Sequence, residues 1–344
     1  MNDSDARSNP VAAHDVAIPY LERTRTYYQA LGYGAPYVWA HFAEVPFVRL
    51  ARPLAACRVA IVTTAAPFQP GRGDQGPGAP YNAHAKFFSV YSGDTRHDHD
   101  LRIAHVAIDR DHTTAEDANA WFPLPALRRA AAKGRIGAVA PRFHGAPTRR
   151  SQRATIDDAA EVTSRCKADH ADAAILVANC PVCHQTMALI ARRLEANGIA
   201  TVVLGCAKDI VEHVGVPRLV FSDFPLGNAA GRPNDRASHD ATLELALALL
   251  ESAPAPRTTV QSPLRWSSDA DWKLDYCNVD RLAPDERNDE NANEAVHAMV
   301  HGNAHAHQSA SPAAFAAAFA SALPASNSAR RRAISSAERR STLQ

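Results

Sequence analysis

Short apolar segments rich in β-branched residues alternate with helix-length segments through most of this 344-residue chain. The apolar segments lie at residues 57–68, 102–109, 135–141, 173–179, 200–206 and 218–224. The helical segments lie at residues 120–134, 186–198, 208–215 and 238–253. Strands joined by crossover helices pair in parallel and are covered on both faces, so the alternation predicts an α/β fold with doubly wound parallel sheets. The pattern starts again after residue 150, and we therefore expect two Rossmann-like lobes.

The same patterns predict how the chain is divided. Residues 1–15 are polar and unpatterned, which predicts a disordered N-terminus. Residues 16–150 form the first predicted α/β lobe, which begins with a helix at 18–31, and residues 151–287 form the second. Residues 288–344 are rich in Ala, Asn, His, Ser and Arg, so we expect a disordered low-complexity tail.

Charge and cysteine content limit the possible classes of function. Lys and Arg number 37 against 36 Asp and Glu, a balance that shows no electrostatic signature for nucleic acid or an anionic membrane. The N-terminus lacks the pattern of a secretory signal, and no apolar run approaches the length of a membrane span. We therefore expect a cytoplasmic protein that acts on a small molecule. Six cysteines are too sparse for a disulfide scaffold, so closely spaced ones indicate catalysis or metal binding.

The segment ANCPVCHQTM, residues 178–187, carries such a pair. Cys180 and Cys183 occupy the predicted turn between a parallel strand and the next helix, where ligands bind in open α/β sheets. A thiol at the start of a helix has its anion stabilised by the helix dipole, so we expect Cys180 to be the more acidic thiol. Cys183 is placed to release a bond at Cys180 by forming a disulfide. We assign both residues, together with His184, to the catalytic site.

Two other interpretations of the pair remain open. Half of a tetrahedral zinc site needs two further ligands, which Cys206 and His184 could supply. A CxxCH pattern also attaches haem, but the setting inside a βαβ unit disfavours that. A redox dithiol is favoured, with no bound metal or cofactor. His184 either stabilises a thiolate or is a solvated residue of the first helical turn.

Further pocket candidates come from the ends of other predicted strands. Thr63 and Thr64 end the first strand, and Cys206 ends a strand expected to neighbour the one before Cys180. Gly227 and Gly231, in FPLGNAAGRPND, could let backbone amides approach an anionic group of a substrate.

The segments AILVANCPVCHQTMALIARRLEANGIATVVL and FPLGNAAGRPND resemble component B of the glycine, sarcosine and betaine reductases, the selenoprotein B family to which D-proline reductase is related. The segments RPLAACRVAIVTTA and DLRIAHVAID are similar to this family as well, so the resemblance runs from about residue 50 to residue 252. In that family selenocysteine attacks a carbon that bears an amine. The resemblance implies that Cys180 is the nucleophile and Cys183 the resolving thiol. His105 and Asp109 match a His and an Asp of the family by position.

The resemblance therefore implies a thiol-dependent reductase with a disulfide as acceptor, restored by a thioredoxin-like donor. It also implies a pyruvoyl-type or carrier subunit as a partner, because the family's pyruvoyl group comes from a separate subunit. A thiol is less acidic and a poorer leaving group than a selenol, so a C–N bond is a harder target for Cys180. The alternatives are a zinc-stabilised or ligand-binding α/β protein and an accessory subunit of a reductase complex.

Overall fold

The computed structural model describes residues 16–30, 37–103, 105–148 and 151–276. The chain divides into the units Met1–Asn291 and Ala292–Gln344, and every described residue belongs to the first. The predicted disordered segments 1–15 and 288–344 lie outside the described residues. No helix in the described part of the chain is long and apolar enough to cross a membrane.

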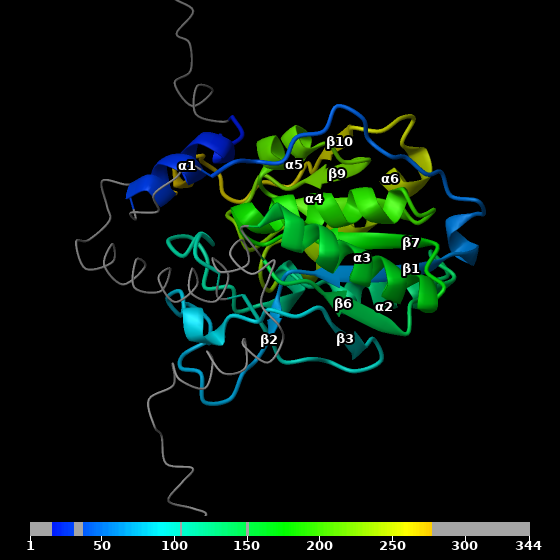
Figure 1. Ribbon diagram of the computed structural model, residues 1–344, viewed down its shortest axis with the longest axis horizontal. Helices are drawn as coiled ribbons and strands as arrows, with labels where there is room; N and C mark the ends of the chain where they lie inside the picture. Colours follow the sequence, from blue (N-terminus) through cyan, green and yellow to red (C-terminus); the bar gives the residue numbers. More distant parts are fainter. Residues whose placement is uncertain (1–15, 31–36, 104, 149–150, 277–344) are drawn as a thin grey trace, which may run out of the picture. The chain divides into compact units, whose positions relative to one another are not determined.

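A single eight-stranded sheet forms the centre of this unit (Figure 1). Its strands run in the order β10-β9-β8-β7-β1-β6-β3, and β5 pairs with β1. The bounds are β1 Arg58–Thr63, β3 Tyr91–Asp94, β5 Ala138–Val139, β6 Arg142–Gly145, β7 Ala173–Val177, β8 Ala200–Gly205, β9 Arg218–Phe221 and β10 Thr258–Gln261. All described pairings in this sheet are parallel except that of β3 with β6. The predicted α/β class is confirmed.

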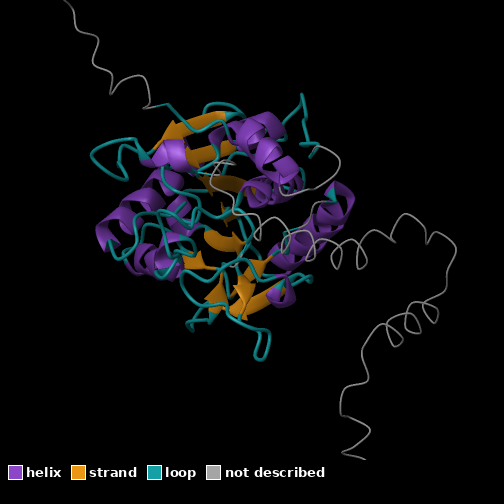
Figure 2. Ribbon diagram, turned by 90° about the vertical axis from the view of Figure 1, so that its left-hand side faces the viewer, coloured by secondary structure: helices purple, strands orange, loops and turns teal. Residues whose placement is uncertain are grey.

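Helices cover both faces of the sheet, as Figure 2 shows. The α-helices are α1 Tyr20–Ala30, α2 Leu124–Ala132, α3 Gln152–Ala168, α4 Pro181–Glu195, α5 Lys208–Val214, α6 Arg236–Ser252 and α7 Trp272–Asp275. Short 3₁₀ helices are η2 Leu54–Ala56, η3 Ala83–Ala85 and η4 Ala118–Ala120. Helix α4 packs against α3 and α5, whereas α2 packs against α6. Strands β1, β7 and β8 are buried almost throughout, which explains their continuous apolar sequence.

The two predicted lobes share this one sheet. Strand β1, from the first, pairs with β7, from the second, in a parallel register that joins Val59 to Ala173 and Thr63 to Val177. The chain runs from β1 to β5 and β6 on one side, then returns past β1 to build β7, β8, β9 and β10 on the other. The carboxyl ends of β1 and β7 therefore form the topological switch point, where open α/β sheets bind ligands.

The predicted strand at 102–109 is wrong in extent. Only Leu101–Arg102 is extended, as β4, which pairs antiparallel with β2, Ala66–Pro67, in a separate two-stranded sheet. The segment after it turns, and the backbone N–H of Asp109 donates to the carbonyl of Leu226, 3.1 Å away. Its backbone is satisfied by a loop, because the β9–α6 connection packs directly against it.

A buried ion pair fixes the extended segment 37–50 to the second half of the sheet. The guanidinium of Arg218 lies 2.8 Å from Oε1 of Glu195, and both side chains are almost completely buried. The other carboxylate oxygen of Glu195 accepts the backbone N–H of Val48, while Arg218 donates to the Val48 carbonyl. The Arg218 guanidinium also lies 4.3 Å from the ring centroid of Phe47. Each buried charge is therefore paired, as burial requires.

Replacing Glu195 with Gln should lower the free energy of unfolding by roughly 3–5 kcal/mol, because it leaves the Arg218 charge buried without a counter-ion. Urea unfolding followed by circular dichroism measures the change. Glu22→Gln is the matched control, since it breaks the exposed Arg25–Glu22 pair and should cost about 1 kcal/mol or less. Equal effects of the two substitutions would contradict the role given to the buried pair.

Candidate functional site: the cysteine pair at the end of strand β7

Cys180 and Cys183 form a buried dithiol at the switch point. Cys180 is the N-cap residue of α4, and its Sγ accepts the backbone N–H of Cys183 at 3.3 Å. The two sulfur atoms lie 2.7 Å apart, and both cysteines are free thiols. The exposed fraction is 3% for Cys180 and 0% for Cys183. The pair can become a disulfide with little movement of the backbone, because the sulfur atoms are already in contact.

The local sequence explains this geometry. Residues of β7 are all buried, which fixes the point where the strand leaves the sheet. Cys180 has the extended backbone of an N-cap residue, with φ −109° and ψ 172°. Pro181 follows in the first turn of the helix, where a missing N–H costs nothing. The spacing of two residues then brings Cys183 back over Cys180 within one turn.

Three side chains from distant parts of the chain surround the pair. The Thr148 hydroxyl lies 3.2 Å from Sγ of Cys183. His105, from the turn after β4, also hydrogen-bonds Cys183. Lys86, directly after η3, acts electrostatically on Cys180. Of these only His105 was predicted, as a pocket candidate, and the structure brings it to the dithiol.

The acidity of the two thiols differs from the prediction. Burial raises the pKa of Cys180 well above its ordinary value, and donation of its S–H to Cys183 raises it further. Burial also opposes ionisation of Cys183, but the hydrogen bond from Cys180, the electrostatic effect of His105 and hydrogen bonds from His105 and Thr148 outweigh it and hold the pKa of Cys183 well below its usual range. The shared proton therefore stays on Cys180 and the negative charge on Cys183. The helix terminus is the weaker influence, since more donors converge on Cys183.

The ring nitrogens of His184 hydrogen-bond backbone groups, and its predicted catalytic role stays a prediction. Its Nε2 accepts the backbone N–H groups of Cys206 and Ala207, at 2.8 and 3.0 Å. Its Nδ1 therefore carries the proton and donates to the Cys180 carbonyl at 2.7 Å. Burial lowers the pKa of His184 to about 4, so the ring is neutral near pH 7.

His184 joins the dithiol turn to the end of β8. A Cβ at Gly205 would lie 2.8 Å from Cδ2 of the His184 ring. The glycine is required here because a larger residue would push the ring away from the two amides that it accepts. Sequence alone does not distinguish this role from the two predicted ones, because the partners are backbone groups 22 and 23 residues away.

The zinc alternative receives no support from the geometry. Both nitrogens of His184 are bonded to backbone, and Cys206 directs its thiol toward the carbonyl of Pro225, 3.8 Å away. Burial raises the pKa of Cys206, which disfavours the thiolate that binds metal. No group of three or more His, Cys, Asp or Glu within the described ranges is arranged to hold a metal ion.

The threonines predicted at the end of β1 lie beside the dithiol turn. Thr63 caps its own turn, because its hydroxyl accepts the backbone N–H of Ala65 at 3.0 Å. Thr64 reaches the neighbouring strand end, where its Oγ1 accepts Nδ2 of Asn179 at 3.2 Å. Asn179 is completely buried, and its Oδ1 has no hydrogen-bond partner among the residues that the structure describes. Asn179 therefore spans the crevice between β1 and β7.

Asp109 and Gly227 hold the loop that carries His105. Burial raises the pKa of Asp109, which is 2.9 Å from Nδ1 of His112. Gly227 has a φ of +108°, and a Cβ there would lie 3.4 Å from Ile103. Both residues therefore hold the loop in place, and the predicted contact of Gly227 with a substrate stays a prediction.

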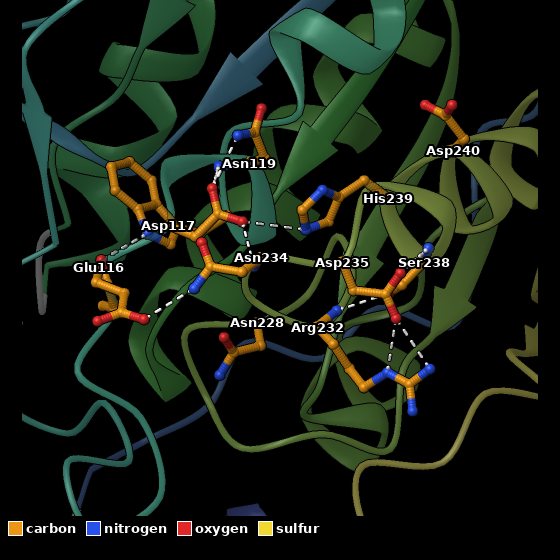
Figure 3. Close-up of polar contacts among 12 residues, drawn as sticks. Glu116, Asp117, Asn119, Asn228, Arg232, Asn234, Asp235, Ser238, His239 and Asp240 are labelled. Atoms are coloured by element: carbon orange, nitrogen blue, oxygen red, sulfur yellow. Dashed lines mark hydrogen bonds and ion pairs between the residues drawn. The ribbon is translucent and has the colours of Figure 1, made fainter.

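A polar network extends this support to the start of α6 (Figure 3). Asp117 accepts the backbone N–H of Asn234 at 2.7 Å and faces His239, whose Nε2 is 3.5 Å away. The side-chain amide of Asn234 in turn donates an N–H to the carboxylate of Glu116 at 2.9 Å. Asp235 caps α6 by accepting the N–H of Ser238. The network joins residues 114–121 to the β9–α6 loop. It therefore stabilises the position of the loop that carries His105.

A cavity of about 1040 Å³ lies at the opposite, amino-terminal end of the strands. Three of the arginines that line it are ion-paired: Arg142 lies 2.7 Å from Asp169, Arg96 2.6 Å from Asp94 and Arg128 2.7 Å from Asp98. A fourth, Arg58, donates to the backbone carbonyl of Asp169 at 3.1 Å.

Acid should destabilise the protein through His184. The folded protein keeps this ring neutral down to a pKa of about 4, whereas the unfolded chain takes up a proton at about 6.5. Stability from this group is thus complete above pH 6.5 and is lost as the pH falls toward 4, by roughly 3 kcal/mol in total. Buried His144, with a pKa of about 4, contributes in the same window. Urea unfolding at pH 7 and pH 5 should show a smaller difference for His184→Gln than for the unmodified protein. The exposed His97→Gln should keep the full difference.

Comparison with known proteins adds one relative. No protein-family model matches the chain, and no solved structure matches it. The chain is 28% identical to D-proline reductase subunit gamma of Acetoanaerobium sticklandii over 182 residues, which cover 52% of this chain and 74% of that subunit. This similarity supports a distant relationship to a subunit of a reductase.

Proposed function

We propose that this protein is a thiol-dependent oxidoreductase of the selenoprotein B type, in which Cys180 attacks the substrate and Cys183 resolves the product as a disulfide. The observation that carries the proposal is the contact of the two sulfur atoms, 2.7 Å apart, at the switch point. The similarity to a reductase subunit agrees with it. A preformed thiolate at Cys183 suits the resolving role, because thiolates are the species that attack a bonded sulfur.

The proposed reduction of the C–N bond takes two steps. Cys180 forms a bond to the substrate carbon while the C–N bond breaks, and the amine leaves with that electron pair and the Cys180 proton. The Cys183 thiolate then attacks the Cys180 sulfur, the S–C bond breaks, and the carbon takes up a proton from water. The substrate gains two electrons, and the dithiol becomes a disulfide. A thioredoxin-like dithiol restores it by exchange.

Partner subunits are part of the proposal. An unactivated C–N bond is a poor target for a thiol, so a separate subunit must activate the amine, by a pyruvoyl group as in the family that the sequence resembles. The relative in Acetoanaerobium sticklandii is named as a subunit. An accessory role within such a complex is the second candidate, favoured by the nearly complete burial of both thiols.

A disulfide-exchange assay with dithionitrobenzoate tests the roles of Cys180 and Cys183. The assay uses the Cys277→Ser variant throughout, so that Cys277 adds nothing to the signal. The unsubstituted pair should release two thionitrobenzoate ions per chain, because Cys183 displaces the second from Cys180. Cys183→Ser should release one and keep a mixed disulfide at Cys180, seen by mass spectrometry. Cys206→Ser is the control and should behave like the unsubstituted pair. If Cys180→Ser keeps the mixed disulfide while Cys183→Ser stays unreactive, the two roles are exchanged.

His105 should set the pH at which the thiolate forms. His105→Gln removes the ring that hydrogen-bonds Cys183, so the pKa of Cys183 should rise. Titration of the thiolate by its ultraviolet absorbance should then show a midpoint at higher pH. The exposed His84→Gln is the matched control and should leave the midpoint in place. An unchanged midpoint in His105→Gln would remove His105 from the site.

A further inference from the structure

A serine, a histidine and an aspartate are in contact, in that order, at the cavity by the amino-terminal end of the strands. Ser92 and His144 are cross-strand neighbours where β3 pairs with β6. The Ser92 hydroxyl lies 2.9 Å from Nδ1 of His144. On the other side of the ring, Nε2 lies 3.2 Å from Oδ2 of Asp169, which directly follows α3. The three groups can therefore supply a nucleophile, a base and the carboxylate that orients the base.

The donors around Ser92 decide where the protons lie. Arg165 donates to Oγ of Ser92 at 2.8 Å, and a guanidinium cannot accept a hydrogen bond. The Ser92 hydroxyl therefore directs its own hydrogen to Nδ1 of His144. The ring proton is then on Nε2, which faces a carboxylate that accepts. Nε2 has no aligned hydrogen bond among the described residues, and catalytic hydrogen bonds often align only when substrate binds.

Burial separates the base from the nucleophile. His144 is completely buried, whereas Ser92 is partly exposed and lines the cavity of about 1040 Å³. Burial also lowers the pKa of His144 to about 4, although the charge of Asp169 opposes this. The ring is therefore neutral near pH 7 and able to take up the proton of the serine. A partly exposed hydroxyl with a buried base behind it is the arrangement of an activated serine.

The lining of the cavity indicates what could reach Ser92. Four arginines and two aspartates line it, so positive charge is in excess. Arg58 donates to a backbone carbonyl, and its guanidinium forms no ion pair with a side chain in the described ranges. Ala138, Val139 and Pro141 supply an apolar wall. The cavity therefore suits a substrate with an apolar body and an anionic group.

We propose that Ser92, His144 and Asp169 form a second catalytic site, which hydrolyses carboxylic esters that carry an anionic group. Ser92 is the nucleophile, His144 is the general base, and Asp169 is a positioning residue that orients the ring. The ring presents Nδ1 to the serine and Nε2 to the aspartate, the reverse of the order in serine proteases, and either nitrogen can carry a proton. This activity goes beyond the proposed reductase function and uses the opposite end of the parallel strands.

The hydrolysis takes two steps and needs only water as a co-reactant. Oγ of Ser92 attacks the ester carbonyl carbon while Nδ1 of His144 takes its proton. The bond from that carbon to the alcohol oxygen breaks, and the alcohol leaves with the proton from His144. Water then attacks the acyl-serine, His144 takes a proton from it and returns this proton to Oγ, and the carboxylic acid is released. Arg165 donates to Oγ throughout and stabilises its negative charge.

Hydrolysis of para-acetoxybenzoate by the full chain tests the site, with release of para-hydroxybenzoate followed by chromatography. Ser92→Ala should lower the rate by at least roughly a hundredfold, because the nucleophile is lost. Ser252→Ala removes an exposed serine at the end of α6 and should keep the full rate. No hydrolysis above the background rate by the unsubstituted chain, or a full rate in Ser92→Ala, would overturn the proposal.

A fluorophosphonate probe identifies the nucleophile without relying on a variant that must fold. The activated serine should attack the phosphorus and displace fluoride, which leaves a stable phosphonate ester. This result also distinguishes the serine from the thiols of the chain, which cleave aryl esters as well. Mass spectrometry of peptides should place the label on Ser92. A label on another residue, or no label, would contradict the assignment.

The charge of the substrate tests the role of Arg58. Arg58→Gln should lower kcat/KM for para-acetoxybenzoate roughly tenfold, the effect of one lost hydrogen bond to a charged group. It should leave kcat/KM unchanged for para-acetoxybenzamide, which has the same shape and no charge. Arg153→Gln, at an exposed position of α3, is the matched control and should change neither value. An equal loss on both esters, or no loss on either, would refute the selection of anionic substrates.

Discussion

The parallel pairing of β1 with β7 is the interaction on which the rest of the structure depends. Five backbone positions, from Val59 to Thr63, are in register with Ala173 to Val177. This pairing joins two stretches of chain that are separated by more than a hundred residues into one sheet. It also brings the carboxyl ends of β1 and β7 together. As a result, Asn179 donates a hydrogen bond to Thr64, and the turn that contains Cys180 and Cys183 lies at the switch point.

Burial gives the dithiol its chemistry. In water, neighbouring thiols ionise nearly independently, but in the interior a charge persists only where donors converge on it. Cys183 receives hydrogen bonds from Cys180, His105 and Thr148, whereas Cys180 keeps its proton and donates it in the hydrogen bond to Cys183. The residues that decide this come from the loop after β4 and the segment after β6. The loop is held by Asp109, Gly227 and the network around Asp117.

Much of the fold followed from the sequence, and the errors have physical causes. The buried strands at Arg58–Thr63, Ala173–Val177 and Ala200–Gly205 were predicted because burial on both faces selects continuous apolar runs. The strand at 102–109 was mistaken because its apolar residues pack against loops, for which periodicity gives no separate signal. The two predicted lobes share one sheet, and a repeated pattern does not reveal whether its halves pair. Thr148 and Lys86 were missed because neither lies in a motif.

The sequence by itself determined the α/β class, the turn that contains Cys180 and Cys183, and the position of that turn at the end of a strand. These are local properties, since hydrophobic period, helix capping and spacing act over a few residues. Only the tertiary structure decided that the sheet is single, that His184 serves the backbone, that His105 reaches Cys183, and that Cys183 holds the charge. Each of these depends on contacts between residues far apart in the chain, and on burial that no local pattern records.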